Sequence, residues 1–244
     1  MSPRTTMAVA ARVLTQLRRD HRTLAMLMVV PAALLTLLWW MFEELPGNFF
    51  DAFGPALLAM FPFIIMFLVT SVTTLRERSS GTLERLLSMP MGKLDFLLGY
   101  AIAFGLVAAV QSAIAVGVSV GLLGLDVQGP VWLLTVVAVV DALLGSSLGL
   151  FVSAFAQTEF QAVQFMPAIV LPQILLCGLF VPRSALPDVL EAISDVLPLS
   201  YAVDAMQELT RSVDPAVWGD LAVVAGFVVA ALVLGAATLR RRTA

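Results

Sequence analysis

Residues 130–155 read PVWLLTVVAVVDALLGSSLGLFVSAF and carry a single charged side chain, Asp141. A stretch of this length and character is typical of a helix that crosses a lipid bilayer, because about 20 apolar residues span a hydrocarbon core of roughly 30 Å. Such a helix also satisfies its own backbone hydrogen bonds where no water is present. The stretch therefore predicts a membrane span.

Five further stretches have a comparable length and apolar character. Together they give six predicted spans, at residues 24–42, 54–75, 96–123, 130–155, 161–180 and 218–239. The whole chain of 244 residues is 60% hydrophobic and 13% charged, whereas soluble domains are about 45–50% apolar and about 25% charged. We therefore expect an all-α integral membrane protein, with residues 1–244 forming one transmembrane domain.

The composition also argues against several other classes of protein. Too few charges remain to cover the surface of a soluble enzyme, a disordered chain or a domain that binds nucleic acid. Cys177 is the only cysteine and His21 is the only histidine. An intrachain disulfide and a Cys/His metal cluster are therefore excluded, and we expect no metal site and no catalytic residue.

Lysine and arginine predict the orientation of the chain, because they gather on the cytoplasmic side of membrane proteins. If the N-terminus is cytoplasmic, 12 of the 14 basic residues fall on that side, and only Arg183 and Arg211 fall outside. All four tryptophans then lie at the outer ends of spans: Trp39, Trp40, Trp132 and Trp218. We expect a multi-pass protein of the plasma or inner membrane, with both termini in the cytoplasm.

Two segments beside the spans have helical periodicity. In residues 7–22 one face is apolar and the other polar, which predicts a helix lying in the cytoplasmic interface; the alternative is a simple positively charged anchor. The apolar positions are Met7, Ala10, Leu14 and Leu17. Residues 181–217 contain short amphipathic pieces, which predict outer re-entrant or interfacial helices before the last span, or a plain outer loop.

The pattern of the loop at residues 76–95 predicts a short amphipathic helix. Gly81 is an acceptable cap, Glu84 is a first-turn acid, and Pro90 ends the helix. Its leucines form a stripe: Leu83, Leu86 and Leu87. Such a stripe either fits a groove on a partner or packs back on the protein's own surface.

These features together resemble a known family. The loop sequence ERSSGTLERLL at residues 77–87 and the segment PLSYA at residues 198–202 are similar to the membrane subunit of type 2 ATP-binding-cassette exporters, which includes drug-resistance, lipid and polysaccharide export permeases. The resemblance extends over nearly the whole chain. One departure is Met89 before Pro90, where many relatives have threonine.

The resemblance implies a division of labour between chains. The loop would be the coupling helix, which docks in a cleft of a separate ATPase subunit through Gly81, Thr82, Leu83, Glu84, Arg85, Leu86 and Leu87. ATP and Mg would be bound by that ATPase, so this chain would hold no cofactor. A second permease copy or a close relative would complete the exporter, and its substrate would be amphiphilic or lipid-like.

The sequence contains no P-loop, the phosphate-binding motif of ATPases, which agrees with this division of labour. A P-loop needs glycine, four residues, then Gly-Lys and serine or threonine. The only Gly-Lys pair, Gly92-Lys93, is followed by Leu94. Two alternatives from other classes remain at this point, namely a non-transporting membrane scaffold and a membrane-embedded enzyme.

Some residues inside the spans also have more than one interpretation. Asp141 is either a polar point on a substrate path or subunit interface, or a structural hydrogen-bonding group. Pro167 and Pro172 interrupt the backbone hydrogen bonds of the fifth span and form either a hinge or a static kink. Two pairs of glycines spaced four apart predict close helix packing: Gly145 with Gly149, and Gly117 with Gly121.

Overall fold

The computed structural model describes residues 2–44, 49–79 and 93–238. These residues form helices without any strand: α1 (Pro3–Arg19), α2 (His21–Phe42), α3 (Phe49–Ser79), α5 (Lys93–Gly121), α6 (Val131–Val152), α7 (Glu159–Leu176), the 3₁₀ turn η1 (Arg183–Ala185), α8 (Asp188–Ser194), α9 (Pro198–Arg211) and α10 (Trp218–Thr238). Six of them are long and apolar enough to cross a membrane: α2, α3, α5, α6, α7 and α10. The predicted all-α fold with six spans is confirmed.

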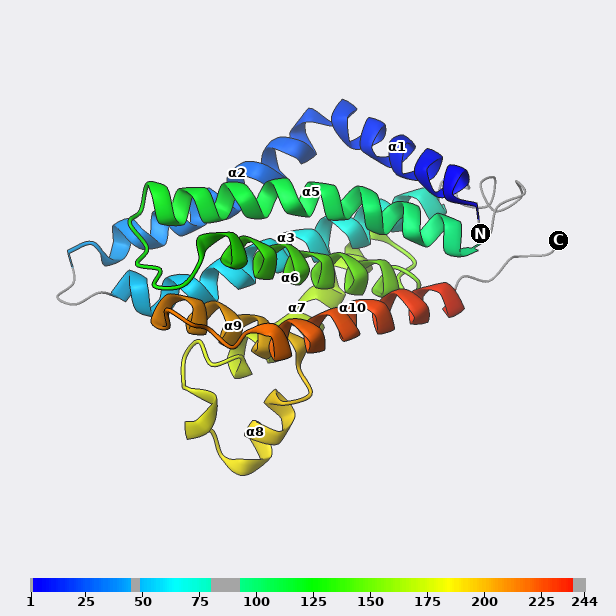
Figure 1. Cartoon of the computed structure of the whole chain (residues 1–244). Helices are drawn as coiled ribbons and strands as arrows, with labels where there is room; N and C mark the ends of the chain where they lie inside the picture. The colour runs from blue at the N-terminus through cyan, green and yellow to red at the C-terminus, as the bar shows by residue number, and fades with distance from the viewer. Residues whose placement is uncertain (1, 45–48, 80–92, 239–244) are drawn as a thin grey trace.

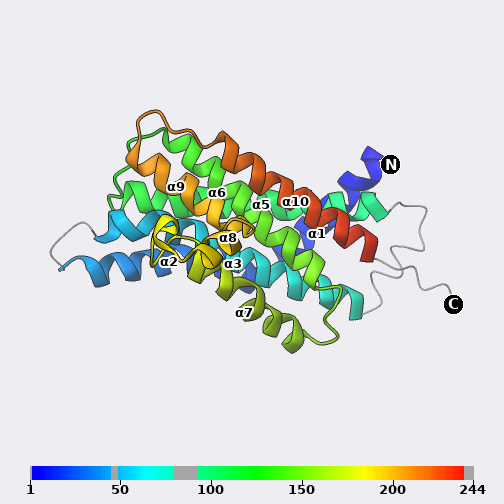
Figure 2. The same cartoon turned by 90° about the horizontal axis from the view of Figure 1, so that it is seen from below.

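The spanning helices lie side by side, and α1 packs across one side of the bundle (Figure 1). The helices α3 and α6 form the centre of the bundle. In their most apolar 18-residue stretches, 61% and 67% of the residues are buried, whereas the value is 17% for α2, α7 and α10. The beginning of α1 and the end of α10 lie at the same end of the bundle, and α8 projects from its side (Figures 1 and 2). The rim helices therefore present apolar surface outward, as a lipid environment requires.

Two glycines allow the central helices to touch. A Cβ atom on Gly145 would lie 2.3 Å from the carbonyl oxygen of Phe63, and one on Gly149 would lie 2.5 Å from that of Phe67. The predicted close packing is confirmed for this pair. It is wrong for Gly117 and Gly121, since a Cβ added there would meet no described atom within 4 Å. Both glycines lie on the outward-facing side of α5.

The fifth span is shorter than the sequence predicts. The stretch 161–180 is apolar throughout, but α7 ends at Leu176. Gly178 follows with a φ of 89°, in the left-handed region that favours glycine and commonly ends a helix. Hydropathy alone does not register this turn, because the residues after it remain apolar.

The first helix also differs from its predicted bounds of 7–22. It begins at Pro3 and ends at Arg19, because the Asp20 carboxylate accepts hydrogen bonds from the Thr23 backbone N–H (3.1 Å) and hydroxyl (2.7 Å). These bonds cap α2 and lower the pKa of Asp20.

The buried face of α1 packs on the protein itself. Val9, Ala10, Val13 and Leu17 share a core with α5 residues such as Tyr100. Met7 was expected on the apolar face but is 57% exposed. Whether α1 lies in the cytoplasmic interface of a membrane stays a prediction.

Candidate functional site

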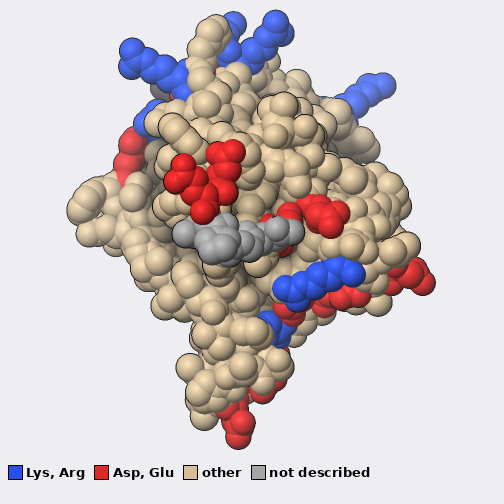
Figure 3. Space-filling view, turned by 90° about the vertical axis from the view of Figure 1, so that its left-hand side faces the viewer, with Lys and Arg blue, Asp and Glu red and all other residues tan. Residues whose placement is uncertain are grey.

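The two ends of the bundle carry different charges. One end, called the basic end, holds the start of α1 and the last turn of α3, with Arg4, Arg76 and Arg78. From there α1 runs along the side of the bundle to its junction with α2 (Figure 1), and these two helices carry Arg12, Arg18, Arg19 and Arg22. The opposite end, called the acidic end, holds carboxylates at or near helix ends: Glu43, Glu44, Asp51, Asp126, Glu208, Asp214 and Asp220. Figure 3 views the bundle from this side and shows acidic groups distributed over it.

The predicted coupling residues, Gly81 to Leu87, lie outside the described residues. The two helices on either side of them are described, however, and both belong to the basic end. The last turn of α3 precedes that segment and the first turn of α5 follows it. The candidate site is therefore built from the side chains of these two turns.

Arg76 and Arg78 join the end of α3 to two different helices. The Arg76 guanidinium binds the carboxylate of Glu159, at the start of α7, through two hydrogen bonds of 3.0 and 3.2 Å. Arg78 donates to the backbone carbonyl of Ser153, at the end of α6, at 2.7 Å. A paired, planar contact like the first also fixes orientation. Movement of this turn of α3 would therefore displace the end of α6 and the start of α7.

Glu77, between these arginines, binds a third helix. Its Oε1 lies 2.8 Å from Nη2 of Arg12 on α1. The Glu77 side chain is 5% exposed and that of Arg12 is 32% exposed. Successive side chains on a helix are about 100° apart, which explains how three consecutive residues contact three helices.

The helix α1 also contacts the first turn of α5. Asp95 is buried, and its Oδ1 accepts hydrogen bonds from the backbone N–H of Ser2 (3.1 Å) and the hydroxyl of Thr6 (3.2 Å). We call this contact, together with Arg12–Glu77, the α1 bridge. It connects both helices that flank residues 80–92. Sequence reasoning missed it, because the partners are 65 to 93 positions apart.

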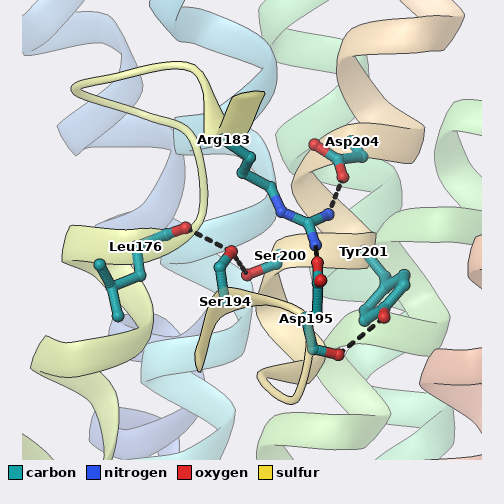
Figure 4. A network of polar contacts seen from close by, with 7 residues as sticks. All are labelled: Leu176, Arg183, Ser194, Asp195, Ser200, Tyr201 and Asp204. Atoms are coloured by element: carbon teal, nitrogen blue, oxygen red, sulfur yellow. Dashed lines mark hydrogen bonds and ion pairs between the residues drawn. The ribbon is translucent and has the colours of Figure 1, made fainter. Parts of the chain in front are cut away.

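A second polar cluster holds the segment after α7. Arg183 pairs with the carboxylates of Asp195 and Asp204 (Figure 4). Its guanidinium carbon lies 5.2 Å from the centre of the Tyr201 ring, a cation–π contact. The Tyr201 hydroxyl donates to the Asp195 backbone carbonyl at 2.7 Å. One arginine therefore connects the turn η1 to the end of α8 and to α9.

Burial and charge act in opposite directions in this cluster. Burial raises the pKa of Asp204, and the nearby Arg183 only partly offsets the increase. Burial would lower the pKa of Arg183, but Asp204 and Asp195 outweigh that effect, so the pKa is raised. Beside this pair, the Ser194 hydroxyl donates to the Leu176 carbonyl at 2.8 Å and lies 3.1 Å from the Ser200 hydroxyl (Figure 4).

Comparison with known proteins identifies the family. The sequence model of the ABC-2 type transporter family matches residues 4–210, which is most of the chain. This chain belongs to the ABC-2 type transporter family. The resemblance noted from the loop and from residues 198–202 is thereby confirmed.

Several curated proteins are similar to this ABC-2 chain. The probable multidrug ABC transporter permease YbhS of Escherichia coli is 29% identical over 60% of this chain and 39% of its own length. The corresponding values for the permease YbhR of the same organism are 28%, 64% and 42%. ABC transporter G family member 20 of Dictyostelium discoideum is 24% identical over 67% of this chain and 22% of its own. The chain therefore spans less than half the length of these relatives.

Asp141 lies in the centre of this ABC-2 domain. It is fully buried on α6, one turn before Gly145, on the side that packs against α3. Neither of its carboxyl oxygens has a hydrogen-bond partner among the residues that the structure describes. A structural hydrogen bond to a neighbouring helix, one of the two interpretations, is therefore not found in this part of the chain.

The prolines of α7 do not interrupt it. The helix continues from Glu159 to Leu176 through Pro167 and Pro172, and both prolines are exposed. The nearby Gln173 is buried and has a clear structural role, since its Oε1 accepts from the backbone N–H of Leu199 on α9 at 3.3 Å. Whether the prolines act as a hinge stays a prediction.

Proposed function

We propose that this chain is the membrane-spanning permease subunit of an ATP-driven exporter. It moves an amphiphilic or lipid-like substrate, such as a drug, lipid or glycan, outward across the cell membrane. A separate ATP-binding-cassette subunit binds ATP and Mg, and a second permease copy or a close relative completes the pathway. Family membership supports the permease role, and the curated relatives with multidrug names support the substrate class.

The observation that carries the proposal is the set of contacts made by the last turn of α3. This turn binds α1, α6 and α7 directly before the loop that resembles a coupling helix. A push on residues 81–87, produced when two ATPase subunits close on ATP, would displace Arg76, Glu77 and Arg78. Their partners would then move with them, and the two permease halves would open on the other side.

The proposed orientation places the basic end in the cytoplasm. The start of α1 and the last turn of α3, with Arg4, Arg76 and Arg78, belong to that end, and the carboxylates near the helix ends belong to the opposite one. This distribution agrees with the enrichment of positive charge on the cytoplasmic side of membrane proteins. Cysteine labelling at position 188 from the external side only would support it, and labelling from the cytoplasm only would overturn it.

The contact with the ATPase can be tested by co-purification. Leu83→Asp combined with Leu86→Asp should abolish recovery of the ATPase with the permease, because two charges replace the apolar stripe. The matched control is Leu122→Asp with Val213→Asp, which adds the same charges at exposed positions near the acidic end. Equal recovery of the ATPase with both double variants would show that the loop is not the docking element.

Transport itself needs a second measurement. The purified complex in proteoliposomes should hydrolyse ATP faster in the presence of a transported amphiphile and should accumulate that amphiphile on the acidic-end side. A complex that assembles but shows neither effect for any amphiphile would instead support a scaffold. A membrane enzyme would use polar groups buried in the spans, and α6 carries two hydroxyls, Ser146 and Ser147, beside Asp141. Substrate turnover without ATP that is lost on replacing these three residues together would support a membrane enzyme.

A further inference from the structure

A cavity of about 240 Å³ opens at the acidic end. It lies between the end of α2, the start of α3 and the turn that follows α5, and it is lined by Trp39, Phe42, Glu43, Phe49, Phe50, Asp51, Leu123 and Gly124. Pockets for drug-sized ligands usually measure about 300–1,000 Å³. This cavity therefore suits a small headgroup better than a whole drug molecule.

Four of the lining residues are aromatic. The rings of Phe42 and Phe49 are stacked, with centroids 6.0 Å apart and planes inclined by 27°. Phe42 makes the same contact with Phe53 one turn further along α3. Trp39 adds an indole from the preceding turn of α2. Aromatic faces carry partial negative charge and attract ammonium groups, indole most strongly.

Two carboxylates complete the lining. Asp51 is held in place because its Oδ1 accepts a hydrogen bond from the backbone N–H of Asp126 at 3.0 Å. Within the ranges 2–44, 49–79 and 93–238, no ion pair involves Glu43 or Asp51. The described residues of the lining include no lysine or arginine. The cavity thus combines uncompensated negative charge with an aromatic wall.

The turn after α5 keeps the cavity open. Gly124 has a φ of 71°, in the left-handed region that side chains disfavour. A Cβ atom at this position would meet no described atom within 4 Å. The backbone therefore forms one wall without a side chain that could fill the space.

We propose that this cavity binds an organic ammonium group of the choline type. The rings of Trp39, Phe42 and Phe49 cover its methyl groups, and Glu43 and Asp51 balance its charge. The group belongs either to a lipid headgroup or to a soluble amine. The proposal goes beyond export, because it concerns equilibrium binding and holds whether or not the chain moves its ligand.

Tryptophan fluorescence gives a direct test. Trp40, Trp132 and Trp218 are exposed and can be replaced by phenylalanine, which leaves Trp39 as the only tryptophan and places the reporter in the cavity wall. In phosphatidylglycerol nanodiscs, choline chloride should change the Trp39 emission in a saturable manner. Its uncharged isostere, 3,3-dimethylbutan-1-ol, should bind at least tenfold more weakly. Equal binding of the two, or no response to choline, would overturn the proposal.

The carboxylates are tested in the same background. Glu43→Gln with Asp51→Asn should weaken choline binding at least tenfold, and the asparagine keeps an oxygen that can accept from Asp126. The charge-matched control, Asp188→Asn with Glu191→Gln on α8, should leave binding unchanged. Equal effects of the two double variants would show that only the overall charge matters. The comparison of choline with its uncharged isostere leaves both carboxylates in place. It can therefore refute the proposal even if the carboxylate variants do not fold.

Phosphatidylcholine nanodiscs distinguish the two sources of the ligand. If the ligand is a lipid headgroup, emission in these nanodiscs will already match the choline-saturated value, and added choline will have little effect. If the ligand is a soluble amine, choline will titrate equally in both lipids. Each result supports an ammonium site and assigns its source.

Discussion

Nη2 of Arg12 lies 2.8 Å from Oε1 of Glu77, across 65 positions of sequence. The pair connects a helix outside the spanning bundle to the end of its central helix α3. Because Asp95 connects the same outer helix to α5, α1 bridges the two helices that flank residues 80–92. Movement of the end of α3 relative to the start of α5 would therefore strain the α1 bridge.

The two partners of this ion pair should respond unequally to removal. Arg12→Gln removes the cation that lies 2.8 Å from the buried Glu77 carboxylate, whereas Glu77→Gln leaves an arginine that is one third exposed. We expect Arg12→Gln to lower the free energy of unfolding by about 1–3 kcal/mol, and Glu77→Gln to lower it less. Thermal unfolding in detergent measures both changes.

The exposed Arg18 on the same helix provides the control for this pair. Arg18→Gln should change stability by less than about 0.5 kcal/mol. The double variant Arg12→Gln with Glu77→Gln should be more stable than Arg12→Gln alone, because the buried charge that Arg12 offsets is then absent as well. A larger loss of stability for Glu77→Gln than for Arg12→Gln would contradict the finding that Glu77 is the more buried partner.

The packing of α3 against α6 makes a clear prediction at Gly145. A new Cβ there would lie 2.3 Å from the carbonyl oxygen of Phe63, so the helices must separate. Gly145→Ala should destabilise the protein by about 1–3 kcal/mol through overpacking. Gly117→Ala adds the same methyl group where no described atom lies within 4 Å, and it should be neutral or stabilising by up to about 1 kcal/mol. Equal unfolding temperatures for the two variants would refute the close contact.

Asp141 should matter for transport more than for stability. Asparagine has nearly the same shape, and the carboxyl oxygens have no described hydrogen-bond partner to lose. We expect Asp141→Asn to leave the unfolding temperature unchanged or raised, because a buried charge is costly, and to reduce export several-fold. Flux in proteoliposomes and unfolding in detergent are measured on the same preparation. Unchanged flux would remove Asp141 from the transport pathway.

The pairing of Arg183 with Asp204 should make the stability of the protein depend on pH. Burial raises the folded-state pKa of Asp204 above its unfolded value, so the folded state binds more protons in that interval and this group's contribution to stability falls as pH rises. The positive charge of Arg183 lowers the pKa of Asp204, so removing Arg183 raises that pKa further. The pH range over which the folded state binds the extra proton then extends to higher pH. Arg183→Gln should therefore lose more stability at about pH 7 than at about pH 4.5, measured by thermal unfolding.

Two variants check that explanation. Arg183→Gln combined with Asp204→Asn should lose most of the added pH dependence, because the titrating carboxyl is gone. Arg211→Gln removes an exposed arginine near the acidic end and should leave the pH profile unaltered. A pH-independent loss for Arg183→Gln would mean that packing, such as the contact with Tyr201, dominates its role.

Local pattern was sufficient for much of the fold. Each span satisfies its own backbone hydrogen bonds and is apolar over its length, so residues such as 130–155 are recognisable without knowledge of their neighbours. Gly145 and Gly149 were also predictable, because small residues four apart favour close helix contact. The same rule was wrong for Gly117 and Gly121, since spacing does not say whether a helix face meets another helix.

The sequence by itself therefore determined the spans, the separation of charge and the family, which depend on composition and on residues close together in the chain. Only the tertiary structure decided which polar groups meet. Arg12 with Glu77, Thr6 with Asp95, and the Asp51 carboxylate with the Asp126 backbone N–H are each brought together by helix packing. No local periodicity encodes these pairs, because their geometry depends on how helices pack across long separations in sequence.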